Sequence, residues 1–166
     1  MSASHKAGWL LLASLCLSSG AWAAPTVYGW IEKGVLMPGG VAVKMKLDTG
    51  ALTSSLDARE LHHFKRDGKP WVRFTLVLTD ANTDKEVRQT LERPVERSVT
   101  VRGAGGMEER PTVTMSVCVG DKLYKEWFTL RDRSDMIYPV LLGRRLLAEL
   151  GPVDSSRTFT VQPSCG

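Results

Sequence analysis

The stretch VAVKMKLDTGA, residues 41–51, decides how this chain of 166 residues is interpreted. Its first seven residues alternate between apolar and polar types, as in a strand with one buried face. Asp48-Thr49-Gly50 then ends the strand and occurs only once in the chain. Two interpretations are open at this point: an ordinary turn, because Asp and Gly are common turn residues, or a loop that presents a catalytic carboxylate. The rest of the sequence has to decide between them.

Residues 1–23 have the composition of a secretory signal peptide. They combine a basic start, an apolar run over residues 9–17 and the small residues Ala21 and Ala23 before the expected cleavage site. The apolar run is too short to span a bilayer. We therefore expect an exported protein, in the bacterial periplasm, with a single domain over residues 24–166.

The charges argue against several classes of partner. The formal net charge is +4 at pH 7, and the two signs are interspersed along the chain. This pattern does not predict a nucleic-acid surface, and no second apolar stretch predicts a membrane span after cleavage of the signal.

We expect neither a metal nor any other cofactor. His62 and His63 are adjacent, so on a strand they would point to opposite faces, and no metal-binding motif or phosphate-binding loop is present.

Two cysteines follow the expected cleavage site, Cys118 and Cys165. An exported protein can keep a disulfide, so a Cys118–Cys165 bridge is one possibility. The alternative is a buried free thiol at Cys118 and an exposed one at Cys165. The sequence leaves both open, since it does not show how close the two residues lie.

Most segments of the chain have the pattern of strands separated by turns. Strands are expected over residues 26–32, 35–37, 41–47, 71–78, 86–102, 112–119, 126–130 and 157–161, with a short strand or helical turn within 52–61. Only residues 144–150 predict a helix, because they are good helix formers that end at Gly151-Pro152. The fold class is therefore all-β with one short helix.

The order of these elements resembles that of the retropepsins, the single-lobe aspartic proteases. They have a strand into Asp-Thr-Gly-Ala, several hairpins, an apolar strand into Gly-Arg, one short helix and a final strand. The resemblance is closer to a bacterial family once labelled ATP-dependent zinc proteases and now regarded as retropepsin-like aspartic peptidases. The similar stretches are GWIE (29–32), KLDTGA (46–51), TS (53–54), RP (110–111), TLRDRS (129–134), Met136 and YPVLLGR (138–144).

This resemblance implies an aspartic endopeptidase that cleaves peptides or proteins. Because the motif occurs once, a complete site requires two copies of Asp48 and hence a homodimer. Two adjacent carboxylates share one proton, so one can activate a water while the other protonates the substrate carbonyl. Thr49 and Gly50 would hold the aspartates in place, Thr49 by a hydrogen bond across the dimer axis. Gly143 and Arg144 would support this loop from below.

Two further expectations concern residues next to the motif. Ala51 has no hydroxyl that could donate to the carboxylate, so the pair of aspartates should be less acidic than that of pepsin and work toward neutral pH. Leu52 occupies the position where retroviral enzymes have an acidic acceptor for the arginine. Arg144 therefore needs another acceptor, for which Asp57 is the candidate.

A retropepsin also needs a flap that closes over the substrate. The turn over residues 79–84 is favoured by its order along the chain, and the glycine-rich tip over residues 103–106 is the alternative. A different class of function also remains open, namely a catalytically silent periplasmic module that binds peptides or regulates a partner on the same fold.

Overall fold

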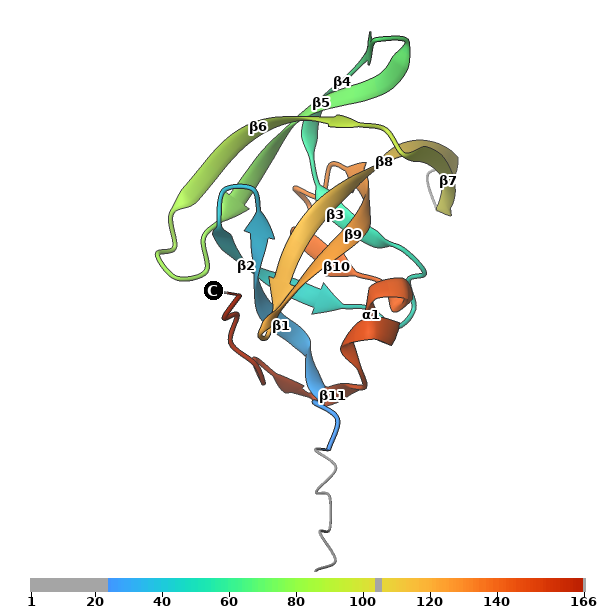
Figure 1. Ribbon diagram of the computed structural model, residues 1–166. Coiled ribbons are helices and arrows are strands. Elements are labelled where there is room, and N and C mark those ends of the chain that lie inside the picture. The colour runs from blue at the N-terminus through green and yellow to red at the C-terminus, as the bar shows by residue number, and fades with distance from the viewer. Residues whose placement is uncertain (1–23, 104–105, 166) are drawn as a thin grey trace, which may run out of the picture.

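The computed structural model describes residues 24–103 and 106–165, so the signal peptide expected over residues 1–23 lies outside the described part. The described residues form eleven strands and one helix (Figure 1). The first six strands are Tyr28–Met37 (β1), Val41–Leu47 (β2), Ser54–Asp57 (β3), Arg59–Arg66 (β4), Lys69–Thr79 (β5) and Glu86–Pro94 (β6). The remaining elements are Arg97–Gly103 (β7), Gly106–Val119 (β8), Lys122–Arg131 (β9), Val140–Leu142 (β10), Arg144–Leu150 (α1) and Val153–Thr158 (β11).

The larger sheet closes on itself. Its strands lie in the order β11-β1-β2-β10-β3-β9-β8-β7, and β1 also pairs with β8. This second pairing joins β1, β2, β10, β3, β9 and β8 into a ring, while β11 and β7 extend beyond it. Closure leaves the strands of the ring without free edges. The Asp48 loop follows β2, a strand held on both sides by β1 and β10.

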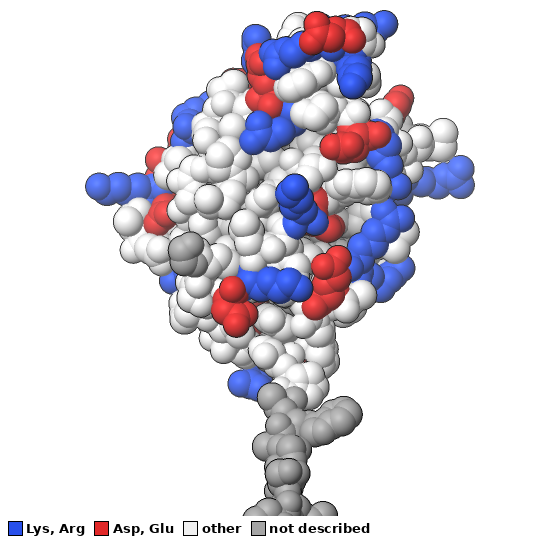
Figure 2. All heavy atoms as spheres, viewed as in Figure 1, with Lys and Arg blue, Asp and Glu red and all other residues white. Residues whose placement is uncertain are grey.

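A second sheet of three strands, β4-β5-β6, packs against the barrel. Apolar residues of β5, among them Val72, Phe74 and Leu76, belong to the same core as Val43, Met45 and the other buried residues of the barrel. The far end of the β4–β5 hairpin projects at the top of Figure 1. Charges of both signs are mixed over the face seen in Figure 2.

The all-β prediction with a single short helix is confirmed, and the helix has the expected bounds. The strand expected over residues 86–102 is wrong, because it is two strands in different sheets. Val95 donates its N–H to Pro70 O at 3.0 Å, whereas Glu96 donates to Thr112 O at 2.9 Å. Directly after Pro94, the strand to which the backbone is hydrogen-bonded thus changes from β5 to β8 within two residues.

The final strand is also displaced, from the expected residues 157–161 to Val153–Thr158. The backbone N–H groups of Thr160 and Val161 donate to the carboxylate of Glu32, at 3.0 and 3.3 Å, and not to a neighbouring strand. The buried side chain of Glu32 therefore binds the backbone of these two residues, where the alternating pattern predicts a neighbouring strand.

The one helix in the described part of the chain, α1, is not long and apolar enough to cross a membrane.

Candidate active site

Asp48 lies directly after β2, at the end of the barrel that carries α1. Its backbone N–H donates to Leu142 O at 2.9 Å, which continues the parallel pairing of β2 with β10 by one residue. The carboxylate is partly exposed, at 23% of its side-chain surface. Thr49 and Gly50 are exposed on the same loop. A short loop at the end of a buried strand thus carries the carboxylate at the protein surface.

The loop is held from below by the start of α1, as expected for Gly143 and Arg144. The backbone N–H of Arg144 donates to Ala51 O at 2.8 Å, and its guanidinium donates to the carbonyl oxygens of Thr49 and Gly50 at 3.0 and 3.1 Å. A side chain at position 143 would place its Cβ only 2.5 Å from Thr53 C. Glycine is therefore required for this close approach.

The acceptor expected for Arg144 is wrong. Asp57 is buried, and its carboxylate accepts from the Arg59 guanidinium at 3.1 Å and from the Arg133 backbone N–H at 2.7 Å. Arg144 binds two backbone carbonyls instead, so it needs no acidic partner. This explains how an apolar residue, Leu52, can occupy the position where an acidic acceptor was expected.

Two donors contact the Asp48 carboxylate. The Gly50 N–H donates to Oδ1 at 3.0 Å, and Lys46 Nζ lies 2.9 Å from Oδ2. Partial burial raises the pKa of Asp48, but the hydrogen bond and charge of Lys46 and the N–H of Gly50 lower it by more, so this pKa lies below its ordinary value. The carboxylate is thus held ionised in the single chain.

The expectation of a less acidic pair of aspartates stays a prediction, because this pKa is that of Asp48 in a single chain; that expectation was based on Ala51. The residue has no hydroxyl, but the Lys46 ammonium takes the place of the missing donor. Lys46 was not predicted as a site residue, although its position indicates this role: alternate residues of a strand share a face, so Lys46 lies on the same face as Asp48.

Lys46→Met is expected to raise the pKa of Asp48, because it removes a charge-assisted hydrogen bond from the ionised form. Ionised Asp48 stabilises the fold above its ordinary pKa, and this contribution is lost as the pH falls through the lowered value. The variant should therefore lose part of that stability at neutral pH. An NMR titration of the Asp48 carboxyl carbon measures the pKa without a substrate.

Lys44→Met is the matched control for this prediction. Lys44 lies on the same face of β2, two residues farther from Asp48, and is exposed. It should leave the titration of Asp48 nearly unchanged. Equal titration curves for Lys46→Met and the wild type would contradict the role of Lys46.

A buried chain of hydrogen bonds lies beneath the loop. The Gly143 N–H donates to Ser54 Oγ at 3.0 Å, and Ser54 Oγ donates to Glu126 Oε1 at 2.6 Å. Burial raises the pKa of Glu126, and the hydrogen bonds from Ser54 and the Trp127 backbone only partly oppose it. Glu126 thus anchors Gly143 through Ser54. This contact could not be predicted from the sequence, because Ser54 and Glu126 lie 72 residues apart.

Glu126→Gln is expected to change how stability depends on pH. Because the carboxyl pKa is raised in the fold, the folded chain binds this proton more tightly than the unfolded chain does. The free energy of unfolding should therefore fall as the pH rises from the ordinary glutamate pKa to the raised value. Gln keeps an acceptor for the Ser54 hydroxyl, but it has no titrating proton. The variant should therefore lose this contribution to the slope of the free energy of unfolding against pH. Urea unfolding at a series of pH values measures it.

Glu109→Gln provides the control, because Glu109 is exposed on β8 and lies outside the surface hollow that Glu126 lines. It should retain the wild-type slope. An unchanged slope in Glu126→Gln would show that the buried carboxyl does not titrate in this range.

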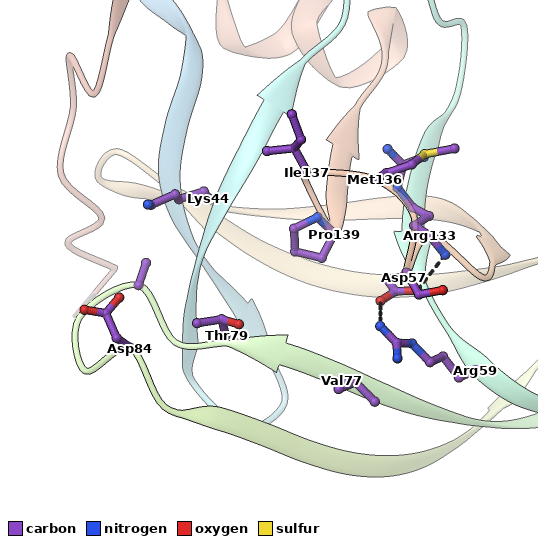
Figure 3. Close-up of a pocket in the computed structure, with 12 residues that line it drawn as sticks. Lys44, Asp57, Arg59, Val77, Thr79, Asp84, Arg133, Met136, Ile137 and Pro139 are labelled. Carbon is purple, nitrogen blue, oxygen red and sulfur yellow. Dashed lines mark hydrogen bonds and ion pairs between the residues drawn. The ribbon is translucent and has the colours of Figure 1, made fainter.

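A pocket of about 270 Å³ opens farther along β2, between the barrel and the smaller sheet (Figure 3). Lys44, Asp57, Arg59 and Arg133 line it, together with residues of β5 and of the loop before β10. Lys44 is four residues from Asp48, or about 13 Å along an extended strand. The pocket thus lies beside the Asp48 loop and does not contain it. An open Asp48 is consistent with half of a site that needs a second copy.

The turn favoured as a flap does not cover Asp48. Ala81 donates its N–H to Ala42 O at 2.7 Å, and Asp80 accepts from the Ala42 N–H at 3.3 Å. These contacts fix the turn at the start of β2, six residues and about 20 Å from Asp48. The favoured flap is therefore wrong. In the alternative tip, residues 104 and 105 lie outside the described residues.

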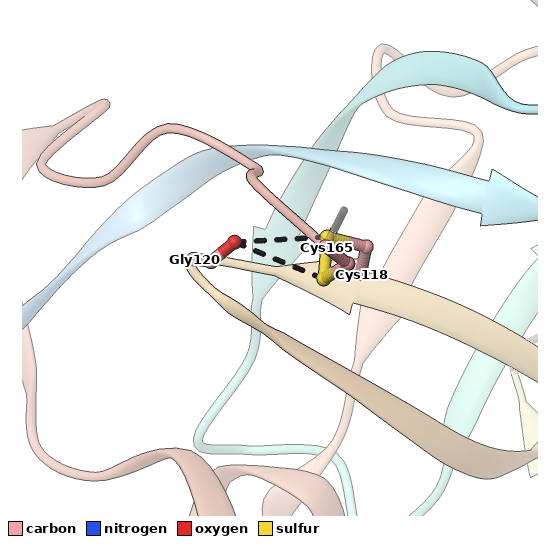
Figure 4. Close-up of a disulfide and its surroundings, with 3 residues drawn as sticks. All are labelled: Cys118, Gly120 and Cys165. Atoms are coloured by element: carbon pink, nitrogen blue, oxygen red, sulfur yellow. Dashed lines mark hydrogen bonds between the residues drawn. A yellow bond between two sulfur atoms is a disulfide. The ribbon is translucent and has the colours of Figure 1, made fainter.

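Cys118 and Cys165 form a disulfide in the structure (Figure 4), with their Cα atoms 6.0 Å apart. His62 and His63 are both exposed on β4. Within residues 24–103 and 106–165, no group of three or more His, Cys, Asp or Glu side chains is placed to hold a metal ion.

Comparison with protein families gives a match over most of the chain. Residues 27–164 match the RimB-like family, described as the retropepsin-like aspartic endopeptidase RimB. A crystal structure of a Legionella pneumophila protein of unknown function is also similar, with a TM-score of 0.69 and 28% identity over 84% of this chain and 100% of that one.

Curated relatives carry a different name. A protein of Shewanella pealeana named as a probable alpha-L-glutamate ligase is 33% identical over 71% of this chain and 26% of its own length. A protein of Desulfotalea psychrophila with the same name is 29% identical over 65% of this chain and 23% of its own length. The chain spans about a quarter of the length of these relatives.

Proposed function

This chain belongs to the RimB-like family of retropepsin-like aspartic endopeptidases, and we propose that two copies of it form one peptidase site from their two Asp48 residues. The single observation that carries this proposal is the Asp48 loop, which presents a partly exposed carboxylate on a support made by Gly143 and Arg144. The sequence of residues 1–23 supports an exported enzyme of the bacterial periplasm.

The proposed mechanism uses no covalent intermediate. Two carboxylates within hydrogen-bond distance of each other do not both ionise, so they hold one proton between them. The ionised member removes a proton from a bound water, which attacks the carbonyl carbon of the peptide. The protonated member donates to the carbonyl oxygen. Thr49, exposed on the same loop, is free to bind the loop of the partner copy.

Acidic peptides are the substrate class that we propose. The curated relatives named as probable glutamate ligases place a region similar to this chain within a longer protein whose name refers to glutamate. Lys44 and Lys46 are also alternate residues of β2, the strand that leads to Asp48. Their side chains therefore lie on the same face of the strand as Asp48. Because Lys46 already pairs with Asp48, a peptide that carries carboxylates would complement chiefly the Lys44 ammonium.

A cleavage assay with rising protein concentration tests the shared site. A glutamate-rich peptide and its glutamine-substituted counterpart are incubated with the purified chain, and mass spectrometry identifies the products. We expect cleavage of the first peptide in preference to the second, with no effect of EDTA. Specific activity should rise with concentration through the range in which sedimentation shows that dimers form.

Each other outcome has a defined meaning. Constant specific activity in a monomeric sample would contradict a shared site, and loss of activity with EDTA would indicate a metallohydrolase. Dimers that bind the glutamate-rich peptide without cleaving it would favour the silent binding module.

A further inference from the structure

We propose that the pocket between the barrel and the smaller sheet binds a carboxylate on a short aliphatic chain, with the Arg133 guanidinium as its counter-ion. The pocket has a volume of about 270 Å³ and is drawn in Figure 3. A single chain carries all the residues named as its lining. The proposal therefore goes beyond the shared site at Asp48 and does not depend on it.

Arg133 is a buried cation without a carboxylate partner. The residue is only 7% exposed. Its Nε donates to Tyr138 O at 3.1 Å, and its Nη1 lies 3.5 Å from Ser55 Oγ, so both acceptors are neutral. None of the ion pairs within residues 24–103 and 106–165 includes Arg133. Because arginine stays charged and buried charges are normally paired, this guanidinium lacks a counter-ion.

The nearby carboxylate of Asp57 does not take this role. It lies 3.1 Å from Arg59 Nη2 and accepts only the backbone N–H of Arg133, at 2.7 Å, as the dashed lines in Figure 3 show. The charge of Asp57 is thus balanced by Arg59. Burial, and next the charge of Arg131, lower the pKa of Arg133 by more than Asp57 raises it. The surroundings of Arg133 therefore favour an added anion.

A second guanidinium on the same pocket also has an unused donor. Arg59 Nε is buried and has no hydrogen-bond partner among the described residues. Oδ1 of Asp132 lies 4.0 Å from it, which is beyond hydrogen-bond distance. Guanidinium groups bind carboxylates through two parallel N–H donors. Two arginines that line this pocket thus have donors that their described neighbours leave unused.

The other charges of the pocket balance each other. They are Lys44 and Asp84, and Figure 3 shows both on the side opposite to Arg133. Since these two charges have opposite signs, they add no net charge at that end. One uncompensated positive charge, that of Arg133, remains in the pocket. This charge matches a single carboxylate.

Apolar side chains complete the walls of the pocket. They are Val77, Ala81, Met136, Ile137 and Pro139. Inorganic phosphate has no apolar part to place against them, whereas an aliphatic acid does. The volume of the pocket is just below the range of about 300–1,000 Å³ for pockets that hold drug-sized ligands. The ligand is therefore a small organic acid group.

Two sources can supply such a carboxylate. One is a free organic acid. The other is an acidic side chain of a peptide bound at Asp48, because Lys44 both lines the pocket and lies on the strand that leads to Asp48. The pocket lies about 13 Å from Asp48 along β2, which corresponds to about four residues of an extended peptide. The recognition chemistry is the same for both sources, and competition distinguishes them.

Butyrate is the probe, because it consists of the carboxylate and aliphatic part of a glutamate side chain. It is titrated into the purified Asp48→Asn chain, and ¹⁵N NMR follows the backbone amides of residues 133–137. We expect saturable shifts with a Kd of about 1 mM, which is within the limit for so small a ligand. 1-Butanol lacks the charge and inorganic phosphate lacks the apolar part. Each should bind at least about tenfold more weakly.

Two substitutions test the residues of the pocket. Arg133→Gln removes the counter-ion, and Ile137→Asp adds a negative charge at a side chain that is 87% exposed and should therefore fold even if Arg133→Gln does not. Each should raise the Kd of butyrate at least about tenfold. Arg157→Gln and Met107→Asp make the same changes at exposed residues outside the pocket and should keep the wild-type Kd. Circular dichroism checks the fold of each variant.

The outcomes decide both the site and its ligand. The absence of saturable shifts up to about 50 mM butyrate would overturn the proposal, and so would a wild-type Kd in the folded pocket variants. Equal affinity for phosphate or for 1-butanol would contradict the organic acid or the role of Arg133. If a glutamate-rich peptide raises the apparent Kd of butyrate, the pocket holds a substrate side chain; an unchanged Kd indicates a free acid. None of these measurements requires cleavage, so failure here leaves the shared site at Asp48 to its own assay.

Discussion

Asp48→Asn is expected to lower the rate of peptide cleavage by at least about a thousandfold, within the range for loss of a general acid–base group. The amide neither removes a proton from water at this position nor donates one to the substrate as a carboxylic acid does. It retains an oxygen that can accept from the Gly50 N–H, now 3.0 Å from Oδ1. The loss of one partly exposed ion pair with Lys46 should cost at most about 1 kcal/mol of stability. Cleavage is followed with the glutamate-rich peptide, and stability by urea unfolding.

Asp132→Asn is the matched control. Asp132 is exposed and, like Asp48, accepts a hydrogen bond from the backbone N–H two residues later, at 2.9 Å from Ser134. This variant should keep the wild-type rate. Equal rates for Asp48→Asn and the wild type would exclude Asp48 from the chemistry.

Mixing the two chains adds a sharper criterion. After subunit exchange in an equimolar mixture of wild type and Asp48→Asn, about a quarter of the dimers contain two Asp48 residues. If both carboxylates are required, the rate should fall to about a quarter of that of wild-type chain at the same total concentration. A rate of about one half would show that each subunit acts alone.

The sequence predicts the parts of the fold that depend on neighbouring residues. The alternation over residues 41–47 and the helix-forming run over residues 144–150 each specify an element locally, and both elements lie where expected. The split of residues 86–102 was missed because both halves have the pattern of strands. Their separation depends on which carbonyl, Pro70 or Thr112, each N–H reaches.

The same distinction applies to the candidate site: short motifs predict some of its contacts, and the others depend on which strands come together in the fold. The Asp48 loop and its support could be read from the sequence, because both are short contiguous motifs. The acceptors of Arg144 could not, since backbone carbonyls leave no trace in residue identity. Glu126 was also missed, because a buried carboxylate is recognised only after β3 and β9 have been paired.

Gly143→Ala is expected to lower the free energy of unfolding by about 1–3 kcal/mol, as overpacking of a tight contact does. The added Cβ would lie within 3 Å of three backbone atoms of Thr53, so no flexible side chain can move aside. This clash can be relieved only if the Asp48 loop shifts relative to α1. A displacement of 1 Å in a catalytic group can cost about a hundredfold in rate. Urea unfolding and the cleavage assay measure the two effects.

Gly40→Ala separates the effect on the loop from a general loss of stability. Gly40 has a φ of +64° and no heavy atom within 4 Å of its added Cβ, so alanine there brings backbone strain of about 1–2 kcal/mol without a clash. Both variants should therefore be destabilised, but only Gly143→Ala should also lose activity at a temperature where both are folded. If the folded Gly143→Ala variant cleaves at the wild-type rate, the support beneath Asp48 tolerates movement and the close approach of Gly143 serves stability alone. A loss confined to Gly143→Ala would instead show that the position of the carboxylate depends on this contact, which is where the β10–α1 junction and the loop after β2 meet.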